Sequence, residues 1–174
     1  KKIDKIQNLM VKIAILDASG ENFITNSDRK FIKYYLDNIK QWTQFEVYIF
    51  GLCLKAFDDE DAYDLALDMI KSNDLSRLVA SHAELVKKTL INIYVYFVCK
   101  NRYAYARKIK SKIETIIDEW DIEAKIIIHM FSNFATFKQE KSSELLNEIR
   151  SDIKVLKKFG VTGIADRLTM FMKR

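Results

Sequence analysis

The fold is decided by residues 43–54, which read TQFEVYIFGLCL. Apolar side chains recur in this segment at the three- and four-residue spacing of an α-helix, with no sustained period of two. They occupy both sides of the helix, with Phe45, Ile49, Leu52 and Cys53 on one side and Val47, Phe50, Leu54 and Phe57 on the other. A helix that is apolar on all sides must be covered on all sides. The segment is therefore predicted to be an inner helix of a stack.

Helical periodicity continues through the rest of the chain, and the composition agrees with it. The 174 residues include no proline and only four glycines, so few positions interrupt a helix. We therefore predict an all-α fold of about nine helices. Capping signals mark the expected helix starts at Thr25 with Asp28, Thr43 with Glu46, Asp58 or Asp59, Ser81 with Glu84, Asp121, and Ser142 or Ser143. Gly20 and Gly160 mark expected helix ends.

The predicted helices alternate in character along the chain. Those that begin near Asp28, Asp59, Arg102 and Ser143 carry one apolar stripe, whereas those around Phe50, Ile91 and Ile127 are apolar nearly all round. This alternation predicts a right-handed solenoid of antiparallel helix pairs, similar to tetratricopeptide repeats, whose inner helices keep a second apolar face for a ligand or partner. A weak internal repeat supports this arrangement, and its two similar segments lie about two units of roughly 39 residues apart. It relates Ile39, Trp42 and Glu46 to Ile117, Trp120 and Glu123.

Sequence signals for catalysis and for cofactors are lacking. No glycine-rich phosphate loop, zinc-protease motif, paired-cysteine motif or serine elbow is present. His82 follows an expected helix start and His129 lies in an apolar helix, so both are interpreted as structural. Cys53 and Cys99 lie in apolar helical runs, as expected for reduced thiols. We therefore predict a protein that is not an enzyme and that has no metal site and no cofactor.

The charge and the hydropathy predict a cytoplasmic protein without a membrane partner. The formal net charge is +5, and basic residues are densest at Arg107, Lys108, Lys110 and Lys112. We interpret this run as a solvated helix face, with a nucleic-acid groove as the alternative. No segment reaches the roughly 20 uninterrupted apolar residues that a membrane span requires, and residues 1–18 carry recurring charges unlike a signal peptide. The chain begins with Lys1, as expected for a processed chain or a piece of a longer protein.

Two asparagines on inner-type helices are the strongest candidates for a binding site. A carboxamide on an apolar helix face costs about 1–3 kcal/mol if it stays unpaired. Amides spaced along a groove can instead bind the N–H and C=O groups of an extended peptide, while aromatic residues take its side chains. The predicted peptide site consists of Asn92, Tyr96, Asn133, Phe50, Leu54 and Phe134. The alternative is that each asparagine bonds to a neighbouring helix inside the core.

Three segments resemble the Rgg/GadR/MutR family of transcriptional regulators. Residues 34–51 contain Trp42, Glu46, Phe50 and Gly51 in a Trp-x-x-x-Glu-x-x-x-Phe-Gly pattern similar to that of the family. The run 90–93, followed by Asn101 and Ala106, is similar to the next family repeat, and residues 153–171 also fit, with a glycine between two helices. Many members have asparagine after the Phe-Gly pair. This chain has Leu52 there, which bears on the polarity of the ligand that the groove accepts.

The resemblance implies a function and a domain organisation. It implies that residues 1–174 are a single helical-repeat regulatory domain, which binds a short hydrophobic signalling peptide in a concave groove and forms a homodimer. A helix-turn-helix domain is expected upstream, outside this chain, and DNA is expected to bind only there. Asn92 matches a family asparagine suited to clamping the peptide backbone. Two other functions stay open: a protein-interaction scaffold whose groove takes a partner helix, and a basic helical module that contacts nucleic acid through residues 107–112.

Overall fold

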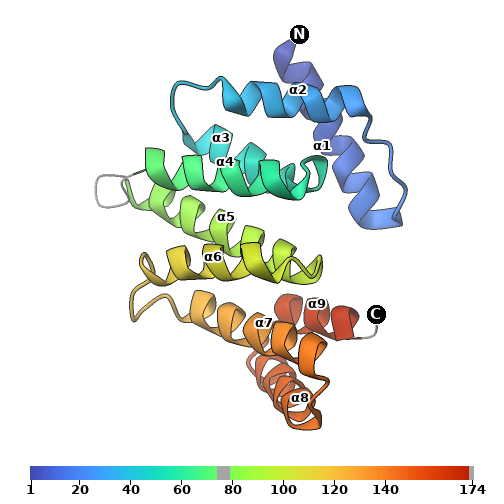
Figure 1. Ribbon diagram of the computed structural model, residues 1–174, viewed down its shortest axis with the longest axis vertical. Coiled ribbons are helices and arrows are strands. Elements are labelled where there is room, and N and C mark those ends of the chain that lie inside the picture. Colours follow the sequence, from blue (N-terminus) through green and yellow to red (C-terminus); the bar gives the residue numbers. More distant parts are fainter. Residues whose placement is uncertain (74–78, 173–174) are drawn as a thin grey trace. The chain divides into compact units, whose positions relative to one another are not determined.

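The computed structural model describes residues 1–73 and 79–172, and these fold into α-helices without any strand (Figure 1). The all-α prediction, with about nine helices, is therefore confirmed over the described residues. The elements are α1 (Lys2–Ser19), α2 (Asn26–Asp37), α3 (Gln44–Leu52), the 3₁₀ turn η1 (Leu54–Ala56), α4 (Asp59–Ser72), α5 (Ala80–Cys99), α6 (Tyr103–Glu114), α7 (Ile122–Glu140), α8 (Ser143–Lys158) and α9 (Thr162–Met172). Among these helices, none combines the length and the apolar character needed to cross a membrane.

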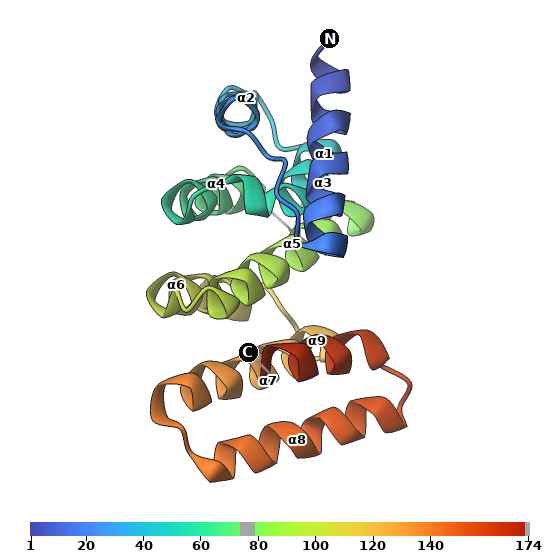
Figure 2. The same ribbon diagram turned by 90° about the vertical axis from the view of Figure 1, so that its right-hand side faces the viewer.

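The chain forms two compact units, and the boundary between them lies within α5. The first unit is Lys1–Tyr96 and the second is Phe97–Arg174. In the first unit α2 lies beside α1 and α4 in both views (Figure 2). In the second unit α8 packs against α7 and α9. Each unit has its own apolar core, and each is described separately below.

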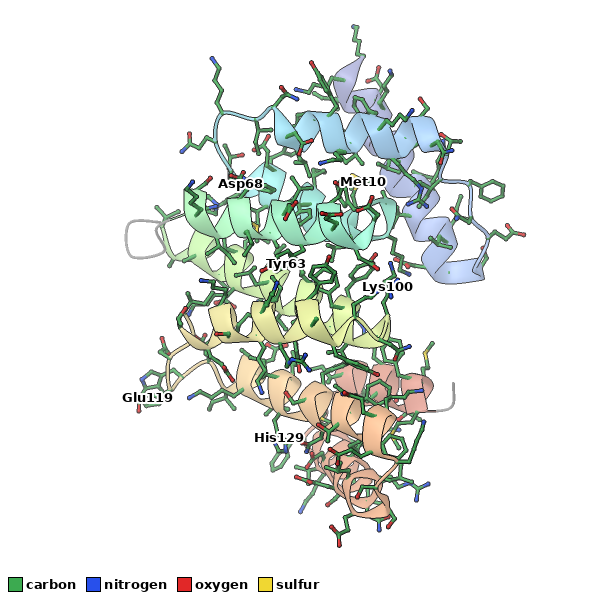
Figure 3. All side chains as sticks on the ribbon, viewed as in Figure 1. Met10, Tyr63, Asp68, Lys100, Glu119 and His129 are labelled. Atoms are coloured by element: carbon green, nitrogen blue, oxygen red, sulfur yellow. The ribbon has the colours of Figure 1, made fainter. Side chains whose placement is uncertain are left out.

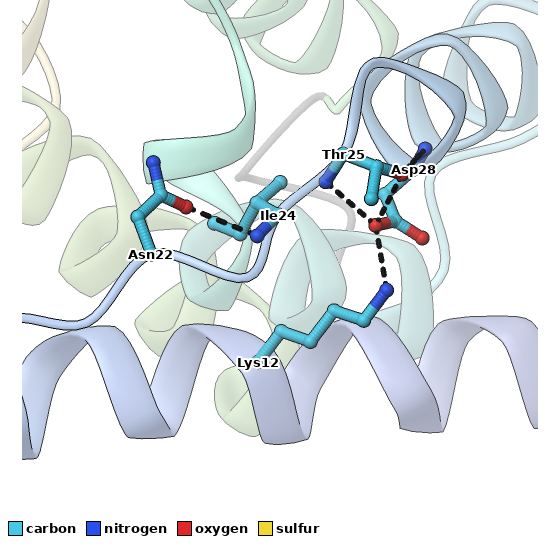
Figure 4. A network of polar contacts seen from close by, with 5 residues as sticks. All are labelled: Lys12, Asn22, Ile24, Thr25 and Asp28. Atoms are coloured by element: carbon cyan, nitrogen blue, oxygen red, sulfur yellow. Dashed lines mark hydrogen bonds and ion pairs between the residues drawn. The ribbon is translucent and has the colours of Figure 1, made fainter.

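The turn from α1 to α2 is held by one carboxylate oxygen of Asp28 (Figure 4). Asp28 Oδ2 accepts hydrogen bonds of 2.8 Å from the Thr25 N–H, the Thr25 hydroxyl and the Lys12 ammonium group. Burial opposes the charge on this carboxylate, but the bonds from Lys12 and Thr25 outweigh it and lower the pKa of Asp28. The predicted cap at Thr25 is therefore confirmed. Gly20, which ends α1, has the left-handed φ of 80° predicted for it.

The start of α3 is joined to the end of α2 through Glu46. As predicted, Thr43 and Glu46 form a reciprocal cap, in which Thr43 Oγ1 accepts from the Phe45 N–H at 3.2 Å and Glu46 Oε2 accepts from the Thr43 N–H at 3.3 Å. The Tyr35 hydroxyl donates a 2.6 Å hydrogen bond to the other oxygen, Glu46 Oε1. Burial alone would raise the pKa of Glu46, but the bonds from Thr43 and Tyr35 lower it below its usual value.

The lowered pKa makes Glu46 a source of acid sensitivity. Its carboxylate stabilises the fold above the unfolded-state pKa, which is near the ordinary value of 4.5, and this contribution is lost as the pH falls through the folded-state value. Chemical denaturation at intervals from about pH 6 to pH 3 should therefore show a steeper loss of unfolding free energy in the wild type than in Glu46→Gln. Glu60→Gln, at an exposed position on α4, is the control and should keep the wild-type slope. Equal slopes for wild type and Glu46→Gln would contradict the prediction.

Three aromatic rings form the centre of the first unit's core. Phe50 lies edge to face with Trp42 at 5.5 Å between ring centroids and with Phe57 at 5.7 Å. Trp42 is 2% exposed, and its indole N–H donates a 2.7 Å hydrogen bond to Asp68 on α4, which is labelled in Figure 3. The predicted repeat partner of Trp42 behaves differently, because Trp120 is 79% exposed in the turn before α7. The two tryptophans therefore do not fill equivalent places.

Helices α3 and α5 run in the same direction and approach each other both near their starts and further along. Near their starts, Gln44 Nε2 donates a 3.0 Å hydrogen bond to the Ser81 hydroxyl. Further along both helices, a Cβ atom at Gly51 would lie 3.3 Å from Oγ1 of the buried Thr89. This is tighter than ordinary packing, so a side chain at position 51 would require Thr89 to move by a few tenths of an ångström. Helices that recur in the same direction are the arrangement expected of a stack of antiparallel pairs.

The core of the second unit lies among α7, α8 and α9. Phe171 of α9 contacts Phe131 and Phe134 of α7, with ring centroids 6.2 and 6.3 Å apart. The predicted cap of α8 is confirmed at Ser142, whose hydroxyl accepts from the Leu145 N–H. After α8, Gly160 adopts a φ of 77°, as its predicted role at a helix end requires.

Two predicted helix starts differ from the structure. Ser81 is not a cap, because α5 already begins at Ala80 and the Ser81 hydroxyl is engaged by Gln44 of α3. Asp121 does precede α7, but its carboxylate accepts from the Asp118 N–H at 2.9 Å and makes no side-chain cap bond to the helix. In both cases a competing partner has taken the side chain: a distant helix residue at Ser81, and a backbone N–H three residues earlier at Asp121.

Candidate functional site

Helix α3 has one apolar face that the fold leaves open. Its buried side holds Val47 and Phe50, and Ile49, four residues after Phe45, is buried as well. On the opposite side Phe45, Tyr48 and Leu52 are 46%, 49% and 37% exposed, and their spacing places them in one row along the helix. We call this row the α3 face. Neighbouring exposed apolar side chains of this size are typical of a binding surface.

Asn92 lies on α5, one turn beyond the point where α5 meets α3. Thr89 is in contact with Gly51 of α3, and Asn92 is the next residue on that side of α5. The Asn92 side chain is exposed and makes no hydrogen bond to any other residue in the described ranges. Tyr96, one turn further along, is half-buried. The interpretation of Asn92 as a core amide is therefore wrong, and its amide is open to a ligand.

Asn133 lies in the second unit and has a partner on its own helix. Its Nδ2 atom is 3.2 Å from Nε2 of His129, one turn earlier on α7. An amide nitrogen only donates, so this contact requires an unprotonated Nε2 on the ring. The side chain is half-buried, and the bond to His129 leaves its Oδ1 atom available as an acceptor.

Three predicted site residues belong to the cores instead. Phe50 is fully buried between Trp42 and Phe57, Leu54 is 6% exposed, and Phe134 is 2% exposed beside Phe171. These side chains pack inside the cores, so the prediction that they contact a ligand is wrong. The prediction chose the wrong side of α3, since a helix that is apolar all round does not reveal which side its neighbours cover. Phe45, Tyr48 and Leu52 were missed, although their three- and four-residue spacing marks them as one row.

The remaining sequence candidates show no sign of a reactive site. Burial raises the pKa of the Cys53 thiol to about 12, so it stays protonated at neutral pH. Both cysteines are free, as predicted. Within the described ranges, no group of three or more His, Cys, Asp or Glu side chains is placed to hold a metal ion. On α6, Arg107, Lys108 and Lys112 are exposed, and Lys110 pairs with Glu114 at 3.7 Å.

Packed helices with an exposed apolar row on α3 define the class of protein, an all-α domain. Residues 1–169 match the family model described as HTH-type transcriptional regulator Rgg, C-terminal domain. The chain belongs to this family, as the resemblance in the sequence indicated.

Solved structures share the fold. The chain superposes with a TM-score of 0.78 and 17% identity on the Streptococcus dysgalactiae SHP pheromone receptor Rgg2, covering 97% of this chain and 64% of the receptor. A form of that receptor with one cysteine replaced by serine gives a TM-score of 0.78 at 16% identity, over 98% of this chain and 62% of the other. A protein from Listeria monocytogenes EGD-e, described as a transcriptional regulator, gives 0.76 at 18%, over 99% of this chain and 62% of the other. The chain therefore spans less than two thirds of the length of these structures.

Proposed function

We propose that this domain binds a short apolar signalling peptide on the α3 face and next to Asn92. The observation that carries the proposal is the exposed row of Phe45, Tyr48 and Leu52 beside an open amide on the adjoining helix. Apolar rings can take the side chains of an extended peptide, while the Asn92 amide both donates to and accepts from its backbone. Tyr96 can add a further contact one turn along α5. In the second unit, Asn133 stays a predicted peptide-binding residue.

The position of Leu52 bears on the chemistry of the peptide. Leu52 stands where many members of the family have asparagine, and it is more than one third exposed at the end of the α3 face. A leucine at this point offers apolar contact area and no hydrogen bond. We therefore expect the part of the peptide that meets Leu52 to be apolar.

Membership of the family supports a regulatory role for this proposed binding event. We propose that the peptide changes the DNA binding of a helix-turn-helix domain attached upstream, in a cytoplasmic homodimer. Membership of a family of transcriptional regulators supports this proposal, as does a relative that is described as a pheromone receptor. We propose no catalytic step and no cofactor, and we assign DNA contact to the upstream domain and not to α6.

Replacement of Asn92 tests the proposed site. A panel of short apolar synthetic peptides, each with a scrambled version, would be titrated into the chain by calorimetry. Asn92→Ala should weaken the best binder about tenfold, because one amide contact to a peptide backbone is worth about 1–3 kcal/mol. Asn147→Ala, an exposed asparagine on α8, is the matched control and should bind like the wild type.

The outcomes separate the proposal from its main rival. Unchanged affinity in Asn92→Ala would show that the peptide does not use this amide. If no peptide binds better than its scrambled version, the domain does not sense peptides in this way. The same apolar face would then fit a partner helix in a protein-interaction scaffold.

A further inference from the structure

His129 lies at the centre of a polar cluster between α7 and α8, within the second unit. The residue is labelled in Figure 3 beside α7. Its Nε2 atom lies 3.2 Å from Asn133 Nδ2, 3.5 Å from Glu148 Oε1 and 3.6 Å from Asp152 Oδ2. His129 and Asn133 are four residues apart on α7, and Glu148 and Asp152 are four apart on α8, so each helix presents two neighbouring side chains. We call these four residues the His129 cluster.

The partners of this one nitrogen atom require opposite protonation states of it. The Asn133 amide donates, so it needs the lone pair of an unprotonated Nε2. The two carboxylates accept, so they need a proton on Nε2. A single ring nitrogen cannot satisfy both sets at once, and one proton decides between them.

One of the two carboxylates, that of Asp152, lacks a hydrogen-bond donor when Nε2 carries no proton. Its Oδ2 atom is buried and has no hydrogen-bond partner among the described residues. Burial raises the pKa of Asp152, although the nearby His129 opposes the shift and Glu148 adds to it. A proton between His129 and Asp152 would satisfy the orphaned oxygen whichever of the two groups holds it, so the proton belongs to the pair.

Both ion pairs that the structure gives His129 are with α8. On its own helix the nearest charged position is Lys125, one turn earlier. Helix α9 contacts α7 through the uncharged ring of Phe171. The carboxylates of α8 are therefore the groups that respond to a proton here.

We propose that His129 is a positioning residue that holds the Asn133 amide when the His129 cluster is deprotonated and releases it when the cluster takes up a proton. At higher pH the Nε2 lone pair accepts from Asn133 Nδ2 and fixes which way the amide oxygen points. At lower pH that lone pair is used by the proton shared with Asp152, and the amide loses its partner. The consequence for a ligand rests on the proposed function: if Asn133 contacts the peptide, affinity should fall as the pH falls.

The switch can be tested on the 174-residue chain without any peptide. In ¹⁵N-labelled protein, the side-chain NH₂ signals of Asn133, assigned by their loss in Asn133→Asp, would be followed between about pH 5 and pH 8. Both signals should shift together along one titration curve. The curve should be absent in His129→Gln, whose amide oxygen can accept from Asn133 but cannot titrate.

Variants of α8 test the role of the carboxylates. In the Glu148→Gln/Asp152→Asn double variant the midpoint of the Asn133 curve should move to lower pH, because two charges that favour the proton are gone. Glu144→Gln, an exposed acid on the same helix, is the matched control and should leave the midpoint unchanged. The proposal is overturned if the Asn133 signals stay constant in the wild type, if they still titrate in His129→Gln, or if the double variant matches Glu144→Gln.

Peptide binding separates this proposal from the proposed function. Titrations with the best-binding synthetic peptide at both ends of the pH range should show weaker binding at low pH in the wild type and a smaller change in His129→Gln. If the Asn133 signals titrate but no peptide binds, the proton switch stands and the proposed function fails. If a peptide binds and the Asn133 signals stay constant, the proposed function stands and the proton switch fails.

Discussion

Phe50→Ala should destabilise the domain by about 3–5 kcal/mol, the cost of removing a fully buried phenylalanine from a core. The ring is fully buried and contacts two other rings, those of Trp42 and Phe57, so its loss leaves a cavity and removes both edge-to-face contacts. Urea denaturation followed by circular dichroism would measure the change. The slope with urea should be compared as well, because a changed slope would show that unfolding is no longer two-state.

Phe45→Ala is the matched control for this prediction. It removes the same side chain from the same helix, but at a position that is 46% exposed on the α3 face. Its free energy of unfolding should stay within about 1 kcal/mol of the wild-type value, since nothing packs fully around the ring. Its affinity for a bound peptide should fall instead. Equal destabilisation by both variants would contradict the assignment of the buried and open sides of α3.

Gly51→Val should also cost stability, by about 1–3 kcal/mol, through overcrowding rather than through a cavity. A Cβ atom at position 51 would lie 3.3 Å from Oγ1 and 3.4 Å from Cγ2 of Thr89, and valine adds two methyl groups beyond it. Thr89 is 3% exposed, so its side chain has little room to move away. Thermal and urea denaturation would both report the loss.

The second helical glycine provides the control. In the described part of the chain, no heavy atom lies within 4 Å of a Cβ built on Gly163, in the first turn of α9, apart from its chain neighbours and the backbone of its own helix. Gly163→Val should therefore stay within about 0.5 kcal/mol of the wild type. Similar losses for the two variants would show that backbone entropy and helix propensity, and not the approach of α3 to α5, decide the effect at position 51.

Local features of the fold could be predicted because they depend on neighbouring residues. The caps at Thr25, Thr43 and Ser142 and the left-handed glycines at the ends of α1 and α8 are satisfied within a few residues of the chain. Ser81 failed because its partner, Gln44, is distant in the sequence. A local sequence pattern predicts a contact only when both contacting residues lie close together in the sequence.

The binding face was harder to predict for a related reason. Periodicity showed that α3 is apolar on two sides, but only packing decides which side is covered. Phe50 and Leu54 were assigned to the ligand and lie in the core, whereas Tyr48 was overlooked and lies on the open row. The aromatic pair Trp42 and Trp120 illustrates the same limit, since similar surrounding residues end in opposite environments. Asn92, in contrast, stood out because a lone amide on an apolar helix needs an explanation.

Because α3 and α5 run in the same direction, their helix dipoles make the surface along the α3 face electrically asymmetric. Each helix has partial positive charge at its N-terminal end and partial negative charge at its C-terminal end. The starts of α3 and α5 lie side by side, whereas α3 ends beside Thr89, in the middle of α5. The edge of the surface near Phe45 and Ser81 therefore favours a negative group, and the end of α3 at Leu52 favours a positive one. The effect is about 0.3–1 kcal/mol for each charge near a helix end. A peptide with free termini that lies along these helices consequently has a favoured orientation, with its carboxylate toward the helix starts.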